Sequence, residues 1–212
     1  TMPEITQESN TISMLPMAHM YSLSFELIFE FFQGAHIHLL TRVPSPKIVA
    51  EAFTLIKPEL IISVPLIIEK IYKTKLKPIL DKRLVKILLS TPIIDKVFLT
   101  RIQTTLNEAF GGRFIEVIVG GAAMNQEVEA FFKKINFRYT IGYGMTECAP
   151  IICYAHWDKT KIGSCGKPVD GMKIRIDSPS PETIPGEILV KGTNVMMGYY
   201  KNEQATKEAL HN

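Results

Sequence analysis

Apolar residues recur with two different spacings along the first two thirds of the chain. Short apolar or β-branched runs predict strands at residues 11–15, 36–40, 59–64, 114–119 and 138–141. Longer segments with apolar residues at helical spacing predict helices at residues 20–32, 46–57, 65–77, 92–110 and 126–135. Strands that alternate with helices are typical of a parallel α/β sheet, which we expect up to about residue 145.

Several helix boundaries carry their own chemical signals. Ser45 followed by Pro46 is typical of a helix start, because the serine can cap the helix and proline fits the first helical position. Thr91-Pro92 repeats this signal, and Asn125 is a third candidate cap. Pro58 disfavours helical backbone at the residue before it, so it predicts the end of the second helix.

The pattern changes beyond about residue 160, where glycine and proline separate short strand-like runs at 172–177 and 187–191. A single helical run follows at 203–210. We therefore predict an α/β fold with a mostly parallel sheet and flanking helices in residues 1–158. A small β-rich subdomain is expected to start within residues 159–212.

Composition narrows the class of protein. The chain has 212 residues, of which 46% are hydrophobic and 21% charged, and this is typical of a globular domain. Its net charge of +3 gives no reason to expect a nucleic-acid partner. The most apolar early run, 23–32, contains Glu26 and Glu30 and is shorter than the roughly 20 residues of a membrane span. Three cysteines without zinc or redox spacing favour a reduced, cytoplasmic protein.

The segment Gly142-Tyr143-Gly144-Met145-Thr146-Glu147 directly follows a predicted strand. Ligands of α/β sheets bind beyond the carboxyl ends of strands, and glycine lets a ligand approach the backbone closely. The hydroxyl of Thr146 can donate to a phosphate oxygen, and the carboxylate of Glu147 can hold Mg²⁺. The ring of Tyr143 offers a flat face to a planar base. An ordinary glycine-containing loop is the alternative for so short a motif.

Other glycine-rich segments flank this motif. Gly120, Gly121 and Ala122 follow a second predicted strand and leave room for a ligand against the backbone. Downstream stand Gly163-Ser164-Cys165-Gly166-Lys167-Pro168, Pro185-Gly186-Glu187-Ile188-Leu189-Val190-Lys191-Gly192 and Met197-Gly198-Tyr199-Tyr200. In this order, the segments resemble the adenylate-forming superfamily of acyl-CoA synthetases, firefly luciferase and peptide-synthetase adenylation domains. The "YGxTE" and "GEIxxxGxxxMxGYY" elements are specific when they occur together, and the resemblance runs from about residue 15 to 210.

Within that superfamily, the chain looks most like the long-chain fatty-acyl-CoA synthetases. A long connection at about 72–110 separates two strand regions that shorter-acid members join more directly. The segment Leu15-Pro16-Met17-Ala18-His19-Met20 is similar to the "LPLAHxxE" element of the long-chain enzymes. The resemblance implies ATP-dependent activation of a fatty acid and its transfer to CoA, with Mg²⁺ as cofactor.

The resemblance also implies a role for individual residues. Thr146 would contact the α-phosphate, Glu147 would bind Mg²⁺, and Tyr143 would pack on adenine. His19 would help shape the carboxylate site, although a histidine with no such role is an open alternative. The remaining residues would line the nucleotide and acyl walls: Gly120, Gly121, Ala122, Gly142, Gly144 and Met145.

Other elements of the superfamily do not occur in the chain, namely the Lys-containing phosphate loop, the "TGD" aspartate and the C-terminal lid. We therefore expect a piece of a longer protein that is inactive by itself. Two alternatives stay open. One is another adenylate-forming ligase, acting on an aryl acid, an amino acid or an acyl-carrier protein. The other is a non-catalytic module that binds a nucleotide or lipid.

Two further features have competing interpretations. A basic stretch between Lys70 and Lys86 suits peripheral contact with the anionic inner face of a membrane, but we favour a solvated helical face. Its basic residues are Lys70, Lys73, Lys75, Lys77, Lys82, Arg83 and Lys86. The aromatic run Phe29, Phe31 and Phe32 is predicted to be core in preference to an acyl tunnel, although the two interpretations are not exclusive.

Overall fold

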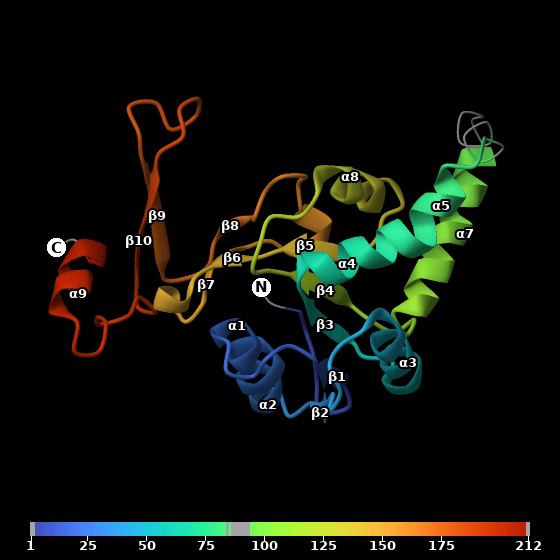
Figure 1. The fold of residues 1–212 in the computed structure, drawn as a ribbon, viewed down its shortest axis with the longest axis horizontal. Coiled ribbons are helices and arrows are strands. Elements are labelled where there is room, and N and C mark those ends of the chain that lie inside the picture. Colours follow the sequence, from blue (N-terminus) through green and yellow to red (C-terminus); the bar gives the residue numbers. More distant parts are fainter. Residues whose placement is uncertain (1–2, 84, 86–93, 211–212) are drawn as a thin grey trace.

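The centre of the molecule is a parallel sheet of five strands in the order β2-β1-β3-β4-β5 (Figure 1). The computed structural model describes residues 3–83, 85 and 94–210. The strands are β1 (Asn10–Ser13), β2 (His36–Leu39), β3 (Leu60–Ser63), β4 (Glu116–Val119) and β5 (Tyr139–Ile141). Each lies within a run that the sequence predicts as a strand or overlaps it, so the parallel α/β prediction is confirmed.

Helical segments cover both faces of this sheet. They are α1 (Met20–Ser22), α2 (Glu30–Phe32), α3 (Pro46–Ile56), α4 (Pro65–Ile71), α5 (Lys77–Leu80), α7 (Ile94–Ala109) and α8 (Gln126–Lys134). Ile61 and Val117 face a large core shared with α3, α4, α7 and α8. Leu60 and Ile62 point the other way, to a smaller core with Tyr21 of α1. Burial on both faces explains why the central strands β3 and β4 read as nearly continuous apolar runs.

The predicted helix caps are present. The side chain of Ser45 accepts a hydrogen bond from Ile48 N, and that of Asn125 accepts from Glu127 N. Helix α3 ends at Lys57, whose φ of 52° is left-handed, directly before Pro58. The predicted helix start at Thr91-Pro92 lies outside the described residues.

Two helices that the sequence predicts as regular contain π-helical turns. Leu23–Phe29 is a π-helix between α1 and α2, and Tyr72–Leu76 is another between α4 and α5. Over one or two turns, i→i+4 and i→i+5 hydrogen bonding place nearly the same residues on the buried face. The apolar spacing therefore predicts a helix here but cannot distinguish its type.

The prediction that Phe29, Phe31 and Phe32 form core is wrong for two of the three. Phe31 is 72% exposed and Phe32 is 80% exposed, whereas Phe29 packs against the smaller core. The face of this helix that meets β1 carries Glu26 and Glu30, both fully buried. Apolar character alone therefore does not identify which positions of this helix are buried.

Two small antiparallel sheets follow the parallel one. The first joins β6 (Tyr143–Gly144), β7 (Ile151–Tyr154) and β8 (Lys167–Pro168), and the sequence analysis missed it. The second is a hairpin of β9 (Met172–Asp177) and β10 (Glu187–Gly192), at the positions predicted. In Figure 1 this hairpin and α9 (Glu203–Ala209) extend away from the central sheet.

Candidate functional site

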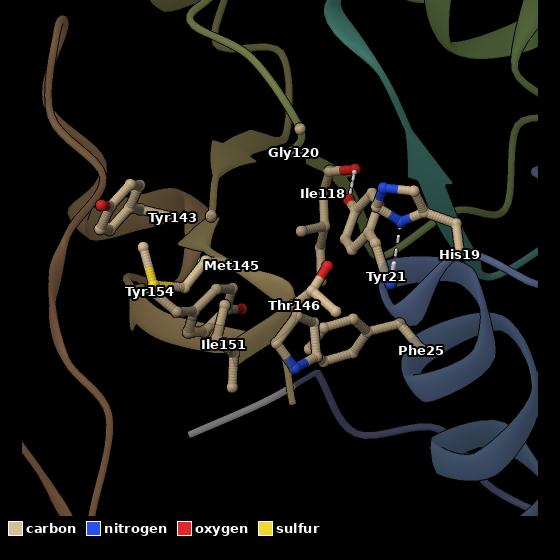
Figure 2. A pocket seen from close by; sticks show the side chains of 14 residues that line it. His19, Tyr21, Phe25, Ile118, Gly120, Tyr143, Met145, Thr146, Ile151 and Tyr154 are labelled. Carbon is tan, nitrogen blue, oxygen red and sulfur yellow. Dashed lines mark hydrogen bonds between the residues drawn. The ribbon is translucent and has the colours of Figure 1, made fainter. Parts of the chain in front are cut away.

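The segments that follow β1, β4 and β5 meet around a pocket of about 520 Å³, including its open mouth (Figure 2). Their convergence follows from the parallel sheet, because all its carboxyl ends lie at one edge. Eight residues singled out from the sequence line this pocket: His19, Gly120, Gly121, Gly142, Tyr143, Gly144, Met145 and Thr146.

Two other candidates do not line the pocket. Ala122 lies in the exposed loop between β4 and α8, two residues beyond Gly120. Glu147 directly follows Thr146, but its carboxylate is hydrogen-bonded to Tyr199 outside the pocket wall. Thr146 and Glu147 are adjacent in the sequence, but their side chains therefore lie on different sides of the same loop.

Close packing explains the glycines after β4. A Cβ atom at Gly120 would lie only 2.9 Å from Cζ of Tyr21, so a side chain there would displace the tyrosine ring. Gly121 has a φ of 87°, a backbone conformation that other residues rarely adopt. The two glycines therefore bring the backbone to the pocket and turn the chain towards α8.

His19 is fixed at the mouth of the pocket as the N-cap of α1. Its Nδ1 accepts a hydrogen bond from Tyr21 N at 3.2 Å (Figure 2). Because that contact uses the lone pair of Nδ1, the neutral ring carries its proton on Nε2. The exposed ring thereby offers an N–H donor at the pocket edge, which suits an acidic ligand.

Thr146 begins a single 3₁₀ turn, Thr146–Cys148, directly after Met145. Its side chain is exposed, and its hydroxyl has no hydrogen-bond partner within 3–83, 85 and 94–210. A free hydroxyl in a pocket wall can donate to an oxygen of a bound ligand. Cys148 at the end of the turn is buried, so its thiol is packed inside the protein.

The loop that carries Glu147 is tied to a later segment that the sequence analysis gave no role. The Tyr199 hydroxyl donates to Glu147 Oε1 at 2.7 Å, and Met196 N donates to Glu147 O at 2.7 Å. Asn194 Nδ2 donates to the carbonyl oxygens of Cys148 and Ile151. The hydrogen bond from Tyr199 lowers the pKa of the Glu147 carboxyl, so that group is an anion at neutral pH.

Aromatic side chains form the apolar wall of the pocket, and the sequence did not single them out. Tyr21, Phe25 and Tyr154 all line it (Figure 2). Tyr21 donates to Ile118 O at 3.1 Å, and Tyr154 donates to the buried Glu116 carboxylate at 2.6 Å. Burial raises the pKa of Glu116. Tyr154 lies on β7, a strand that the sequence pattern does not predict. Sequence reasoning therefore could not place this side chain at the pocket.

The donor set for a metal consists of a single carboxylate. No cluster of three or more histidine, cysteine or acidic residues occurs in the described part of the chain. Mg²⁺ usually takes one or two carboxylates and completes its shell with phosphates and water. Glu147 suits such a site, because each carboxylate oxygen has two lone pairs and the hydrogen bond from Tyr199 uses only one lone pair of Oε1.

The basic stretch is partly neutralised. Lys73 lies 3.3 Å from Glu69, and Lys77 lies 2.7 Å from Glu127. Lys86 lies outside the described residues. Among the helices that the structure describes, none is long and apolar enough to cross a bilayer.

A family model described as "AMP-binding enzyme" matches residues 2–200. The chain belongs to this family. It is 30% identical over 174 residues to the long-chain-fatty-acid–CoA ligase FadD15 of Mycobacterium bovis, covering 73% of this chain and 28% of that protein. It is 26% identical over 235 residues to long chain acyl-CoA synthetase 4 of Arabidopsis thaliana, covering 97% and 34%. The chain spans about a third of the length of these relatives.

Solved structures of the family share the fold. The benzoate CoA ligase of Burkholderia xenovorans superposes with a TM-score of 0.69 at 18% identity, covering 96% of this chain and 37% of that one. The O-succinylbenzoate coenzyme A synthetase of Bacillus subtilis, solved with ATP and magnesium, gives 0.67 at 23% identity, covering 98% and 38%. At these identities the likeness establishes the acyl-CoA-synthetase-like architecture and no more.

Proposed function

We propose that the intact protein activates a long-chain fatty acid with ATP and transfers it to CoA. In the first step, the fatty carboxylate attacks the α-phosphorus of ATP, which gives acyl-adenylate and pyrophosphate. In the second step, the CoA thiol attacks the acyl carbonyl carbon, which releases AMP and gives the thioester. ATP, Mg²⁺, the fatty acid and CoA are the ligands that this proposal requires.

The observation that carries the proposal is the Thr146 hydroxyl, which lines the pocket across from Gly120 (Figure 2) and has no hydrogen-bond partner in the described part of the chain. In this proposal, the hydroxyl donates to an α-phosphate oxygen and Tyr143 packs against adenine. The N–H of His19 at the pocket mouth orients the acid carboxylate. Holding both reactants in line removes much of the entropic barrier, and fixed donors stabilise charge that develops on the phosphate oxygens.

Glu147 is the residue that would hold Mg²⁺. When bound, the ion supplies positive charge that offsets repulsion between the two anionic reactants. Tyr199 keeps the Glu147 carboxylate ionised and directed away from the apolar wall. The cation would therefore lie beside the pocket, next to the phosphates, and the acyl chain would lie against the aromatic wall.

A long aliphatic acid suits the apolar pocket wall, which includes Phe25, Ile118 and Ile151. Both relatives described above carry long-chain acyl names. An aryl acid is the second candidate, because Tyr21, Phe25 and Tyr154 could pack against an aromatic ring. The 2-succinylbenzoate–CoA ligase of Bacillus cereus is 41% identical over 98 residues, covering 44% of this chain and 20% of that protein.

ATP–pyrophosphate exchange by the intact protein separates these candidates. Palmitate, octanoate, benzoate and 2-succinylbenzoate should be compared at equal concentrations, followed by CoA and acyl-carrier protein as acceptors. We expect palmitate to give the fastest exchange and CoA to be the acceptor. Faster exchange with either aryl acid would assign an aryl acid as the substrate. No exchange with any acid would favour a non-catalytic nucleotide- or lipid-binding module.

We propose a cytoplasmic protein whose basic stretch is a solvated surface. The pairing of Lys73 and Lys77 with carboxylates supports this, since paired lysines have less charge to offer a membrane. Co-sedimentation with phosphatidylserine vesicles at physiological salt should leave the protein in the supernatant. Binding that weakens when Lys70 and Lys82 are changed to Gln would instead assign a peripheral membrane role.

A further inference from the structure

A buried polar contact joins β1 to the helix that packs on it. Its members are Thr11, Ser13, Ser22, Glu26 and Glu30, each at most 4% exposed. A helix that covers a sheet normally presents apolar side chains there, because burying a charged group is costly unless it is well hydrogen-bonded. The two carboxylates therefore need a specific reason to lie at this position.

Glu26 receives hydrogen bonds from four groups. Its Oε1 accepts from Met14 N at 3.2 Å, and its Oε2 accepts from Leu15 N at 3.1 Å. The hydroxyls of Ser13 and Ser22 also donate to Oε2. Strand β1 ends at Ser13, so the amides of Met14 and Leu15 lie beyond it. Glu26 thus gives partners to backbone groups at the point where the chain leaves the sheet.

These contacts define the loop that carries His19. The loop begins at Leu15, closes with a hydrogen bond from His19 N to Pro16 O at 2.9 Å, and enters α1. Ser22, on the first turn of that helix, reaches back with its hydroxyl towards Leu15 O at 3.2 Å and also donates to Glu26. A single carboxylate therefore connects the start of the loop to the helix that follows it.

We infer that Glu26 is a positioning residue that fixes the loop at 15–19 and thereby sets His19 at the mouth of the pocket. The functional part of this inference rests on the proposed acid activation, in which His19 orients the carboxylate. The structural part does not, because the orientation of His19 can be measured without any substrate.

Glu30 provides a matched control. It lies four residues further along, is equally buried, and also faces β1. Among the described residues, its carboxylate accepts a hydrogen bond only from the Thr11 hydroxyl, at 2.6 Å, and its Oε1 has no partner. Glu30 therefore shares the burial and side-chain type of Glu26, but among the described residues it makes no hydrogen bond to the His19 loop.

Nitrogen NMR of the histidine rings at pH 8 tests the inference in the 212-residue chain. Gln at position 26 places an amide NH₂ where one carboxylate oxygen accepted, so a buried backbone N–H loses its partner. The loop at 15–19 then loses its anchor, and His19 Nδ1 no longer keeps its hydrogen bond from Tyr21 N. We therefore expect Glu26→Gln to move the two His19 nitrogen signals towards the average of both tautomers. Glu30→Gln should leave them in place. Unchanged His19 signals in Glu26→Gln, or equal changes in both variants, would overturn the inference.

Two further measurements cover the remaining outcomes. Should Glu26→Gln fail to fold, Ser22→Ala removes one donor at little cost in shape, and the His19 signals of that variant should move from their wild-type positions towards the average of both tautomers. Unchanged signals in that variant would also overturn the inference. In the intact protein, Glu26→Gln should raise the KM for the acid about tenfold while the KM for ATP stays within about twofold. An equal rise in both constants would indicate a general loss of structure and contradict positioning.

Discussion

Thr146 and Glu147 show how neighbouring residues acquire different tasks. The Thr146 hydroxyl lines the pocket without a partner, whereas the Glu147 carboxylate accepts a hydrogen bond from Tyr199. The 3₁₀ turn that begins at Thr146 rotates the second side chain away from the first. Their order in the sequence suggests a shared ligand, but their directions indicate that the ligand must extend beyond the pocket to reach both.

Changing Glu147 to Ala in the intact protein should lower the rate of acyl-adenylate formation by at least about a hundredfold, because the change removes the proposed Mg²⁺ ligand. Pyrophosphate exchange measures that rate, and calorimetric titration with Mg²⁺ and a non-hydrolysable ATP analogue measures metal binding separately. Tyr199→Phe is the control, since it removes the same hydrogen bond but keeps the carboxylate. Near-normal exchange in Glu147→Ala would refute the metal role.

Glu30 gives the chain a predictable dependence of stability on pH. Burial raises the pKa of this carboxyl from 4.5 to about 8. Between those values the folded chain holds a proton that the unfolded chain has released, so the free energy of unfolding falls as pH rises. Relative to Glu30→Gln, the wild type should lose at most about 1.4 kcal/mol per pH unit between pH 5 and 8. Urea unfolding at three pH values measures this, and parallel curves would contradict the shift.

The elements that build the site are short loops at the ends of strands. Strand β1 leads to His19, β4 leads to Gly120, and β5 leads to Gly142. The loop after β4 is closed by the cap of α8, where Asn125 Oδ1 accepts from the amides of Glu127 and Val128. The position of Gly120 and Gly121 therefore depends on where α8 begins.

Replacing Asn125 with Ala should lower the free energy of unfolding by about 1 kcal/mol, because two amides of α8 lose their acceptor. Denaturant unfolding of the chain measures the change. Asn125→Asp keeps an acceptor oxygen at the cap and should retain most of the stability. A loss as large in Asn125→Asp as in Asn125→Ala would mean that the side chain has another task than capping.

At the scale of the whole molecule, the chain corresponds to one part of its relatives. It spans 28% of the mycobacterial ligase and 34% of the plant synthetase named above. The pocket supplies a Thr hydroxyl and a His N–H, and the Glu147 carboxylate lies outside its wall. Two-step ligation also requires groups that hold the rest of ATP and the CoA thiol, and we expect other parts of the intact protein to provide them.

The isolated 212-residue chain should therefore form no acyl-CoA from palmitate, ATP, Mg²⁺ and CoA. A radiolabelled palmitate assay detects the thioester directly. The Glu147→Ala form of the same chain, purified identically, controls for contaminating ligases from the expression host. Turnover that exceeds this control would show that the chain holds a complete catalytic site.

Local chemistry in the sequence determined most of the elements. The caps Ser45 and Asn125 and the stop at Pro58 act within one helical turn, so no distant residue is needed to place them. The nearly continuous apolar strands likewise required a sheet buried on both faces. Seven of the residues singled out from the glycine-rich segments line one pocket together with His19, because parallel strands end at a common edge.

Only the tertiary structure decided which buried groups meet. Phe31 and Phe32 are exposed. Glu26 and Glu30 are buried, because hydroxyls of β1 and α1 and two backbone amides beyond β1 give the carboxylates partners. Tyr199 reaches Glu147 across 52 residues of sequence. Such pairings depend on where the chain returns in space, and no periodicity within a single segment contains that information.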